Sequence, residues 1–324
     1  MADIALAEPM SSDAERAVAV RRGGSRDTRF RLFTLAAALI VLGIFAGVMA
    51  SLLIGAWPAM AHFGWAFLYT EAWNPVTEKF GALASVYGTL VTSLLAMLVA
   101  VPVGIGIAIF LTEICPRPLR RPIGIAIELL AGIPSIIYGI WGLFIFAPWF
   151  QEHIQTALVD ALAGVPYLQD YFGGPPYGIG IFTAALILSI MVLPFISAVT
   201  RDVFETVPHV LKEAAYGLGC TTWEVMWRVV LPFARSGVVG GAMLALGRAL
   251  GETMAVTFVI GSVSRLQASI ISPSTTISAQ IANNFGDADG LQLSSLMALG
   301  LLLFILSFCV LALARWMIGR VDSL

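Results

Sequence analysis

Six long apolar segments, separated by shorter polar stretches, run through the chain. Each exceeds the roughly 20 residues that a helix needs to cross the hydrocarbon core of a bilayer, at about 1.5 Å per residue. We therefore expect an all-α integral membrane protein with six spanning helices and both termini on one side of the membrane. The apolar segments are residues 32–57, 85–111, 123–150, 178–199, 237–261 and 293–318.

The segment before the first apolar run has no helical periodicity. Residues 1–31 mix acidic, small and basic residues, and we expect a disordered cytoplasmic tail here. The run that follows is too long for the apolar part of a secretory signal peptide, which has about 7–15 residues. The predicted organisation is thus a tail, residues 1–31, and a six-span domain, residues 32–324, whose polar elbow occupies residues 201–235.

Composition agrees with a membrane protein and suggests no metal site. Of the 324 residues, 59% are hydrophobic and only 12% are charged, and the mean hydropathy is +0.90. Cysteine and histidine occur singly, without the spacing of a disulfide framework or of metal ligands. These isolated residues are Cys115, Cys220, Cys309, His62, His153 and His209.

The basic residues lie unevenly about the six spans. Of 18 Lys and Arg residues, 15 fall in the tail, the loop between the second and third spans, the elbow, or the C-terminus. Only Lys79 and Arg265 lie on the other side, and Arg248 is inside a span. Because cytoplasmic loops are enriched in basic residues, we expect the termini and the elbow in the cytoplasm. The outer loop, residues 151–177, lacks Lys and Arg and is expected to hold a short surface helix.

The elbow is predicted to contain two short helices. Pro208 suits the first turn of one helix, and Gly217 and Gly219 are expected to end it by permitting a left-handed residue. Thr221 and Glu224 have the spacing of a capping box that starts the second helix. Pro232 is expected to close that helix.

The second arm of the elbow carries one apolar face. Trp223, Met226, Trp227 and Val230 follow the i, i+3, i+4, i+7 spacing of a helical stripe. Arms of roughly ten residues are unstable alone in water, so we expect this face to pack on a partner.

The elbow resembles the cytoplasmic signature of ABC importer permeases, E-A-A-x-x-x-G-x(9)-I-x-L-P, with Val229 in place of Ile. The resemblance implies a coupling helix that fits a groove on an ATPase subunit. The alternative is an amphipathic interfacial loop that only connects two spans. The residues that match the signature are Glu213, Ala214, Ala215, Gly219, Leu231 and Pro232.

Nothing in the sequence indicates a nucleotide site or covalent catalysis. No phosphate-binding loop or G-x-G-x-x-G pattern is present, so we expect no cofactor and no enzymatic activity in this chain. The energy for transport would come from another subunit or from an ion gradient.

Three ionisable residues lie inside apparent spans. Arg248 is near the expected bilayer midplane, where a central arginine costs about 2.5–3.5 kcal/mol to insert. Glu252 follows at i+4 and would share its helical face. Either the two form a structural ion pair, or Arg248 binds a permeant oxyanion and Glu252 moderates its affinity. Glu128, near Arg120 and Arg121, is expected to form a structural ion pair.

Three further stretches resemble the C-type permeases of phosphate ABC importers, the PstC family: residues 73–75, 128–143 and 245–255. The resemblance extends from about residue 30 to the C-terminus. It implies the type I ABC importer permease fold, a role for Arg248 and Glu252 in phosphate translocation, and an inner-membrane location. It also implies an A-type permease partner, two copies of a cytoplasmic ATPase that binds ATP and Mg²⁺, and a periplasmic phosphate-binding protein.

The sequence thus favours a permease subunit that carries inorganic phosphate inward. A permease for sulfate, molybdate or phosphonate is the nearest alternative, because one Arg and one Glu do not distinguish tetrahedral anions. A proton-coupled secondary transporter using Glu252 would not need the elbow. An intramembrane enzyme would need a nucleophile or a metal cluster near the midplane, which the sequence does not offer.

Overall fold

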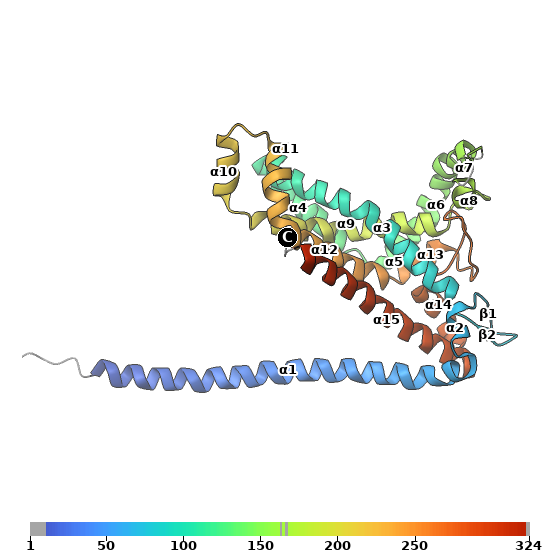
Figure 1. The fold of residues 1–324 in the computed structure, drawn as a ribbon, viewed down its shortest axis with the longest axis horizontal. Coiled ribbons are helices and arrows are strands. Elements are labelled where there is room, and N and C mark those ends of the chain that lie inside the picture. Colours follow the sequence, from blue (N-terminus) through green and yellow to red (C-terminus); the bar gives the residue numbers. More distant parts are fainter. Residues whose placement is uncertain (1–10, 163, 166–167, 322–324) are drawn as a thin grey trace, which may run out of the picture. The chain divides into compact units, whose positions relative to one another are not determined.

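The computed structural model is almost entirely helical (Figure 1) and describes residues 11–162, 164–165 and 168–321. Within the described residues, four π-helical turns extend or join helices, and a 3₁₀ turn covers Phe285–Asp287. The π-helical turns are Phe110–Ile114, Gly142–Phe146, Gln151–Gln155 and Met226–Val230. The hairpin strands are β1, Trp73–Asn74, and β2, Lys79–Phe80. The α-helices are α1 Ser11–Phe63, α2 Ala66–Tyr69, α3 Leu83–Ile109, α4 Arg117–Ala131, α5 Ser135–Trp141, α6 Ala147–Phe150, α7 Thr156–Leu162, α8 Leu168–Phe172, α9 Ile181–Glu205, α10 His209–Gly217, α11 Thr222–Val225, α12 Leu231–Leu250, α13 Met254–Ile260, α14 Ile277–Asn284 and α15 Gly290–Val321.

Five helices in the described part of the chain are long and apolar enough to cross a membrane. A sixth span is present if the bent pair Arg117–Ala131 and Ser135–Leu162 is counted as one. The five are Thr28–Phe63, Leu83–Ile114, Ile181–Glu205, Thr222–Leu250 and Gly290–Trp316. The expected all-helical membrane fold is therefore confirmed.

The N-terminal helix differs from the expected tail. Helix α1 begins at Ser11, so residues 11–31 are helical where the sequence predicts an irregular segment, and residues 1–10 lie outside the described residues. Much of this stretch consists of Ala, Glu and Arg, which favour helix, and it adjoins an apolar helix that needs no new nucleus. Contacts divide the chain into two compact units, residues 1–54 and 55–324. A domain boundary at residue 32 stays a prediction.

The third predicted span is broken rather than straight. Helices α4 and α5 meet at an angle of 86°, at a break centred on residues 132–134. Pro134 precedes the first residue of α5 and supplies no N–H to α4, while Gly132 removes the side chain that would stabilise a continuing helix. The break therefore follows from residues that the sequence analysis assigned to the interior of a span.

The fifth predicted span starts earlier and is also broken. Helices α11 and α12 form one continuous helix through the π-helical turn Met226–Val230, so the prediction that Pro232 closes a helix is wrong. Pro232 lies just after that turn, where the altered hydrogen-bond register accommodates its missing N–H. Helix α12 then ends at Leu250, and three residues, 251–253, separate it from α13.

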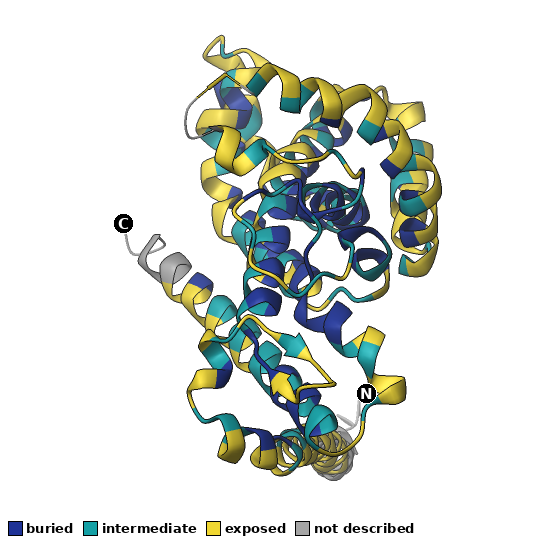
Figure 2. Cartoon of the chain, turned by 90° about the vertical axis from the view of Figure 1, so that its right-hand side faces the viewer, coloured by how far each residue is buried: buried dark blue, intermediate teal, exposed yellow. Residues whose placement is uncertain are grey.

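The core of residues 55–324 is built around α3 and α9, which pack against each other along their length. Small residues permit this contact: a Cβ at Gly104 would lie 2.6 Å from Cγ2 of Ile196. Helices α12 and α13 also pack on α9. Figure 2 shows that buried residues gather in the interior of the chain, whereas the outer faces of the helices are largely exposed. Close helix packing through small residues is the arrangement that membrane helices favour, because lipid offers no hydrophobic drive for their association.

Two opposite ends of residues 55–324 carry the polar elements. Helices α10 and α11 lie at one end, and the β1–β2 hairpin and α14 lie at the other (Figure 1). The predicted surface helix of the 151–177 loop is present as α7 and α8. The elbow and the hairpin can therefore face opposite sides of a membrane.

Candidate functional site

The first arm of the elbow ends in a Schellman motif. The N–H of Gly219 donates to the carbonyl of Tyr216, and the N–H of Cys220 donates to the carbonyl of Ala215. Gly219 is left-handed, with φ of +87°, as the sequence predicts. Gly217, by contrast, is the last residue of α10 and keeps a negative φ, so only one of the two predicted glycines forms the turn.

The second arm begins with the predicted capping box. The hydroxyl of Thr221 accepts a hydrogen bond from the N–H of Glu224, and the Glu224 carboxylate accepts one from the N–H of Thr221 at 2.9 Å. These two bonds satisfy amides that the first helical turn leaves unpaired. The sequence therefore identified the start of this arm correctly.

The apolar stripe of the second arm is divided between the interior of the chain and its surface. Met226 and Val230 are buried against Phe204 and neighbouring residues of the same chain. Trp223 and Trp227 remain 64% and 51% exposed and contact each other edge to face. The π-helical turn, which inserts an extra residue into the helical repeat, alters the register of a simple 3.6-residue stripe.

An ion pair that the sequence did not predict joins helix α10 of the elbow to the π-helical turn that extends α3. Nζ of Lys212, on α10, lies 2.6 Å from Oε1 of Glu113, in the turn that extends α3. Both side chains are only 12% exposed. The two residues are 99 positions apart in the sequence, so no local sequence signal predicts this pairing.

The residues that match the permease signature are partly exposed and partly buried. Ala215 is buried and packs the elbow on its own chain, and Leu231 is half-buried. Glu213, Ala214, Gly219 and Pro232 are exposed. Two apolar side chains outside the signature, Val210 and Leu218, are also exposed at this end, Leu218 by 87%. The elbow therefore presents an apolar surface to whatever lies beyond it.

Arg248 and Glu252 do not share a helical face, so this part of the sequence prediction is wrong. Arg248 lies in the last turn of α12 and is exposed, whereas Glu252 lies beyond the end of that helix. The two side chains form no ion pair with each other in the described part of the chain. Instead, Oε1 of Glu252 accepts a hydrogen bond from the N–H of Ala255 at 3.4 Å, at the start of α13.

The two helices that follow the breaks in the third and fifth predicted spans lie side by side. Helix α5 begins after the break at Pro134, α13 begins after the break at Glu252, and the two helices pack on each other. A Cβ at Gly139 would lie 3.1 Å from the carbonyl oxygen of Met254. The region of Arg248 is thus built from helix ends, whose unpaired N–H and C=O groups can be hydrated or bind ions.

Glu128 forms the structural ion pair that the sequence predicts, but with a different partner. Its Oε1 lies 2.8 Å from Nη1 of Arg201, on α9, rather than beside Arg120 or Arg121. Arg201 also contacts Asp202 at 3.2 Å. Because helix α4 packs on α9, a residue distant in sequence replaces the nearby arginines.

The described residues contain no group of three His, Cys, Asp or Glu side chains placed to hold a metal ion. The three cysteines are free. It stays a prediction that this chain binds no cofactor and that ATP and Mg²⁺ bind to a partner ATPase.

Comparison with known proteins identifies a family for the chain. Residues 100–323 match the family model described as binding-protein-dependent transport system inner membrane component. The phosphate transport system permease protein PstC of Mesorhizobium japonicum is 61% identical over 96% of this chain and 95% of its own length. The protein of the same name from Pasteurella multocida is 57% identical over 91% and 92%.

Solved structures agree on the fold. A bacterial alginate ABC transporter, in complex with an alginate-bound periplasmic protein, matches 91% of this chain and 97% of its own, with a TM-score of 0.61 at 16% identity. The MetNI methionine ABC transporter in an inward-facing conformation matches 74% and 94%, with a TM-score of 0.52 at 20% identity.

Proposed function

The chain belongs to the family of binding-protein-dependent transport system inner membrane components, and from this we infer that it is the membrane-spanning subunit of an ATP-driven importer of inorganic phosphate. The observation that carries the choice of substrate is the 61% identity, over nearly the whole chain, to a phosphate transport permease. The chain lies in the inner membrane, and it transports rather than catalyses.

The partners are those of an ABC importer: an ATPase and a substrate-binding protein. We assign this chain an A-type permease as the other half of the pore, two copies of the ATPase, and a periplasmic phosphate-binding protein. ATP and Mg²⁺ bind to the ATPase. Exposed apolar side chains on α4, on α5 and on the π-helical turn after α5, including Leu129, Ile137 and Phe144, are consistent with burial in lipid or in a second permease.

The elbow is assigned the coupling role. Its exposed apolar surface, Val210, Leu218 and Trp223, supports docking on a protein at this end. Glu213, Ala214 and Gly219 lie on the same short segment and would contact the ATPase, as would the exposed Pro232 at the start of α12. Ala215, which is buried, and Leu231, which is half-buried, would keep the elbow packed on its own chain. Movement of the ATPase would then reach the membrane helices through the Lys212–Glu113 contact.

Arg248 is assigned to the phosphate path. It is exposed, and the described part of the chain provides it with no ion pair, although it is the only charged residue within residues 236–250. An unpaired guanidinium at that depth requires water or an anion, and its planar fork suits the oxygens of phosphate. Glu252 would moderate the affinity by placing a carboxylate at the adjacent helix break, since a path must also release its ion.

Uptake measurements in cells test the proposal. Deleting the gene for this chain should abolish high-affinity uptake of [³²P]phosphate, and the wild-type chain should restore it. Sulfate uptake in the same cells serves as the control for the alternative oxyanion. Loss of sulfate uptake with normal phosphate uptake would show that the substrate is wrong.

A further inference from the structure

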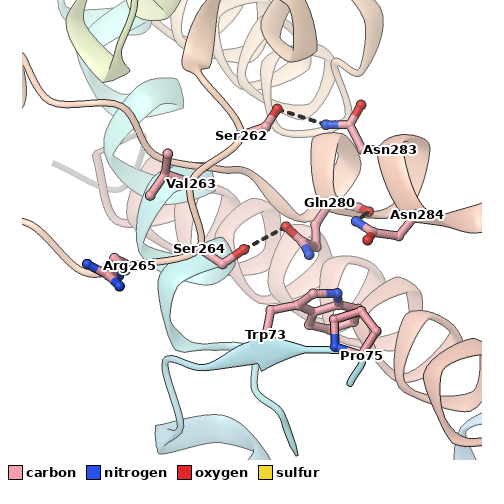
Figure 3. A pocket seen from close by; sticks show the side chains of 9 residues that line it. All are labelled: Trp73, Pro75, Ser262, Val263, Ser264, Arg265, Gln280, Asn283 and Asn284. Carbon is pink, nitrogen blue, oxygen red and sulfur yellow. Dashed lines mark hydrogen bonds between the residues drawn. The ribbon is translucent and has the colours of Figure 1, made fainter. Parts of the chain in front are cut away.

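A polar cavity of about 440 Å³ lies at the end of residues 55–324 opposite the elbow. Three separate segments line it: the β1 hairpin, the loop after α13, and α14. Figure 3 shows the side chains. They are Trp73, Pro75, residues 262–265, Gln280, Asn283 and Asn284.

The charge of the lining is positive. Arg265 contributes a guanidinium, and the other lining side chains are hydroxyls, amides, an indole and apolar groups. The lining residues, all of them described, include no carboxylate. Such a cavity suits an anion, because it offers a cation and hydrogen-bond donors without a competing negative charge.

Trp73 and Gln280 each bring a hydrogen-bond donor to the lining of the cavity. The indole N–H of Trp73 is buried and makes no hydrogen bond within the described part of the chain. Gln280 is only 4% exposed, and its Oε1 accepts from the hydroxyls of Ser264 and Thr275, so its amide nitrogen is turned the other way. Figure 3 shows that nitrogen on the side of Trp73. A buried donor without an acceptor is costly, and a bound oxyanion would satisfy the indole N–H of Trp73. The same oxyanion could also accept from the amide of Gln280.

One group in the cavity is fixed as an acceptor. Nδ2 of Asn284 donates to the backbone carbonyl of Gln280 at 2.8 Å. Since a carbonyl can only accept, the atom of Asn284 that bonds it must be the nitrogen, Nδ2. Oδ1 of Asn284, a residue that lines the cavity, is therefore left as an acceptor. An oxyanion that still carries a proton can donate to such an acceptor, whereas sulfate cannot.

The loop is held in place before any ligand arrives. Ser262 adopts a left-handed conformation, with φ of +53°, that a residue other than glycine rarely takes. The Asn283 amide donates to its hydroxyl at 2.8 Å, and the N–H of Val263 donates to the carbonyl of Ser274. Strain maintained by surrounding contacts is characteristic of binding sites.

We propose that this cavity binds inorganic phosphate on the outer side of the membrane, as an entry site that the ion occupies before it reaches Arg248. The proposal rests on the proposed function and names a second site for the same substrate. Arg265 supplies the charge, Trp73 and Gln280 supply hydrogen-bond donors, and Asn284 accepts the proton that phosphate retains at neutral pH.

Equilibrium binding of [³²P]phosphate to the purified permease–ATPase complex, without the binding protein, tests the site directly. The Arg248→Gln background removes the other proposed cation, so the remaining binding reports on the cavity. Adding Arg265→Gln should weaken this binding about tenfold, as expected for the loss of a charge-assisted hydrogen bond. The matched control is Lys79→Gln. Lys79 is an exposed cation of the β1–β2 hairpin and does not line the cavity, so its loss should leave binding within about twofold.

Competition tests the acceptor. Arsenate, which also carries a proton, should displace phosphate, and sulfate should not. Asn284→Leu should reduce this preference for phosphate over sulfate. Equal binding in the Arg248→Gln protein with and without Arg265→Gln would overturn the proposal, as would competition by sulfate equal to that by arsenate.

Uptake into proteoliposomes separates an entry site from a docking surface. With Arg248 intact, Arg265→Gln should lower the maximal rate of phosphate uptake even when the binding protein is saturating. Recovery of the wild-type rate as the binding protein is raised would mean that Arg265 serves docking, and would overturn the proposal. Failure of the wild-type complex to transport phosphate would instead refute the proposed function.

Discussion

Arg248 is the residue on which the transport proposal depends most. It lies in the last turn of α12, before the break that starts at Gly251, and is exposed, so its guanidinium can exchange one anion for another without breaking an internal ion pair. Replacing it tests charge and geometry separately, because glutamine removes the charge and lysine removes only the planar fork.

We expect Arg248→Gln to lower phosphate uptake by roughly 10- to 100-fold, the loss of one charge-assisted hydrogen bond, while the complex still assembles. Arg248→Lys should retain an intermediate rate. Uptake of [³²P]phosphate and co-purification of the ATPase are the measurements. Wild-type uptake in Arg248→Gln would remove this residue from the path.

Glu252 combines two functions that different substitutions separate. Its carboxylate accepts from the N–H of Ala255, so it stabilises the start of α13. The proposed second function is to moderate the anion affinity of Arg248. Glu252→Gln keeps an acceptor oxygen and loses the charge, whereas Glu252→Ala loses both.

We expect Glu252→Gln to impair uptake with little change in melting temperature, because the helix start is retained. Glu252→Ala should impair uptake and also destabilise the protein by about 0.5–2 kcal/mol, the usual cost of losing a helix cap. Thermal unfolding in detergent and uptake are measured together. Normal uptake in Glu252→Gln would leave Glu252 with a capping function only.

At the scale of the element, the elbow depends on one left-handed residue. Gly217 and Gly219 both have open space where a Cβ would be added, so alanine meets no steric clash at either position. They differ in backbone conformation, since only Gly219 has a positive φ. The pair therefore isolates the effect of the turn.

Gly219→Ala should strain the end of α10 by about 1 kcal/mol and reduce the uptake of phosphate per ATP hydrolysed. Gly217→Ala should be neutral, because alanine is favoured in a helix. Transport and ATPase activity are assayed on the same proteoliposomes. Equal coupling ratios in the two variants would argue against a role for this turn in coupling.

The ion pair between Lys212 and Glu113 joins the elbow to α3. Because both side chains are largely buried, removing one partner leaves a charge without compensation. A double-mutant cycle with Glu113→Gln and Lys212→Met should give a coupling energy of about 1–3 kcal/mol in thermal unfolding. The doubly substituted protein should be more stable than the sum of the single changes implies. Simple additivity would show that the pair does not hold the elbow.

At the scale of the whole molecule, the distribution of basic residues predicts one orientation, with the elbow in the cytoplasm and the hairpin, at the opposite end, outside. Gln169 in α8 belongs to the loop predicted to lie outside, and Leu218 belongs to the elbow predicted to lie in the cytoplasm. Both are exposed and accessible to a thiol reagent.

In a protein whose native cysteines are replaced by serine, Gln169→Cys should react with an impermeant maleimide added to intact spheroplasts. Leu218→Cys should react only after the membrane is opened, because the positive-inside rule keeps the elbow in the cytoplasm. The extent of labelling on a gel is the measurement. The reverse pattern would invert the proposed topology and would place the cavity lined by Arg265 in the cytoplasm.

Local patterns in the sequence determined the membrane class, the approximate spans, the capping box at Thr221 and the left-handed Gly219. These features depend on residues a few positions apart, whose hydrophobic period or turn chemistry does not need the rest of the chain. The family likewise followed from short motifs with fixed spacing.

Only the tertiary structure decided which charged side chains pair with each other. Glu128 pairs with Arg201 and Lys212 pairs with Glu113 because helices distant in sequence pack together, and no local pattern encodes that choice. The breaks at Pro134 and Glu252 are similar: glycine and proline occur in intact and broken membrane helices alike, since neighbouring helices can satisfy the freed backbone groups. Arg248 and Glu252 therefore looked like a helical pair in the sequence, and only packing around the break separated them.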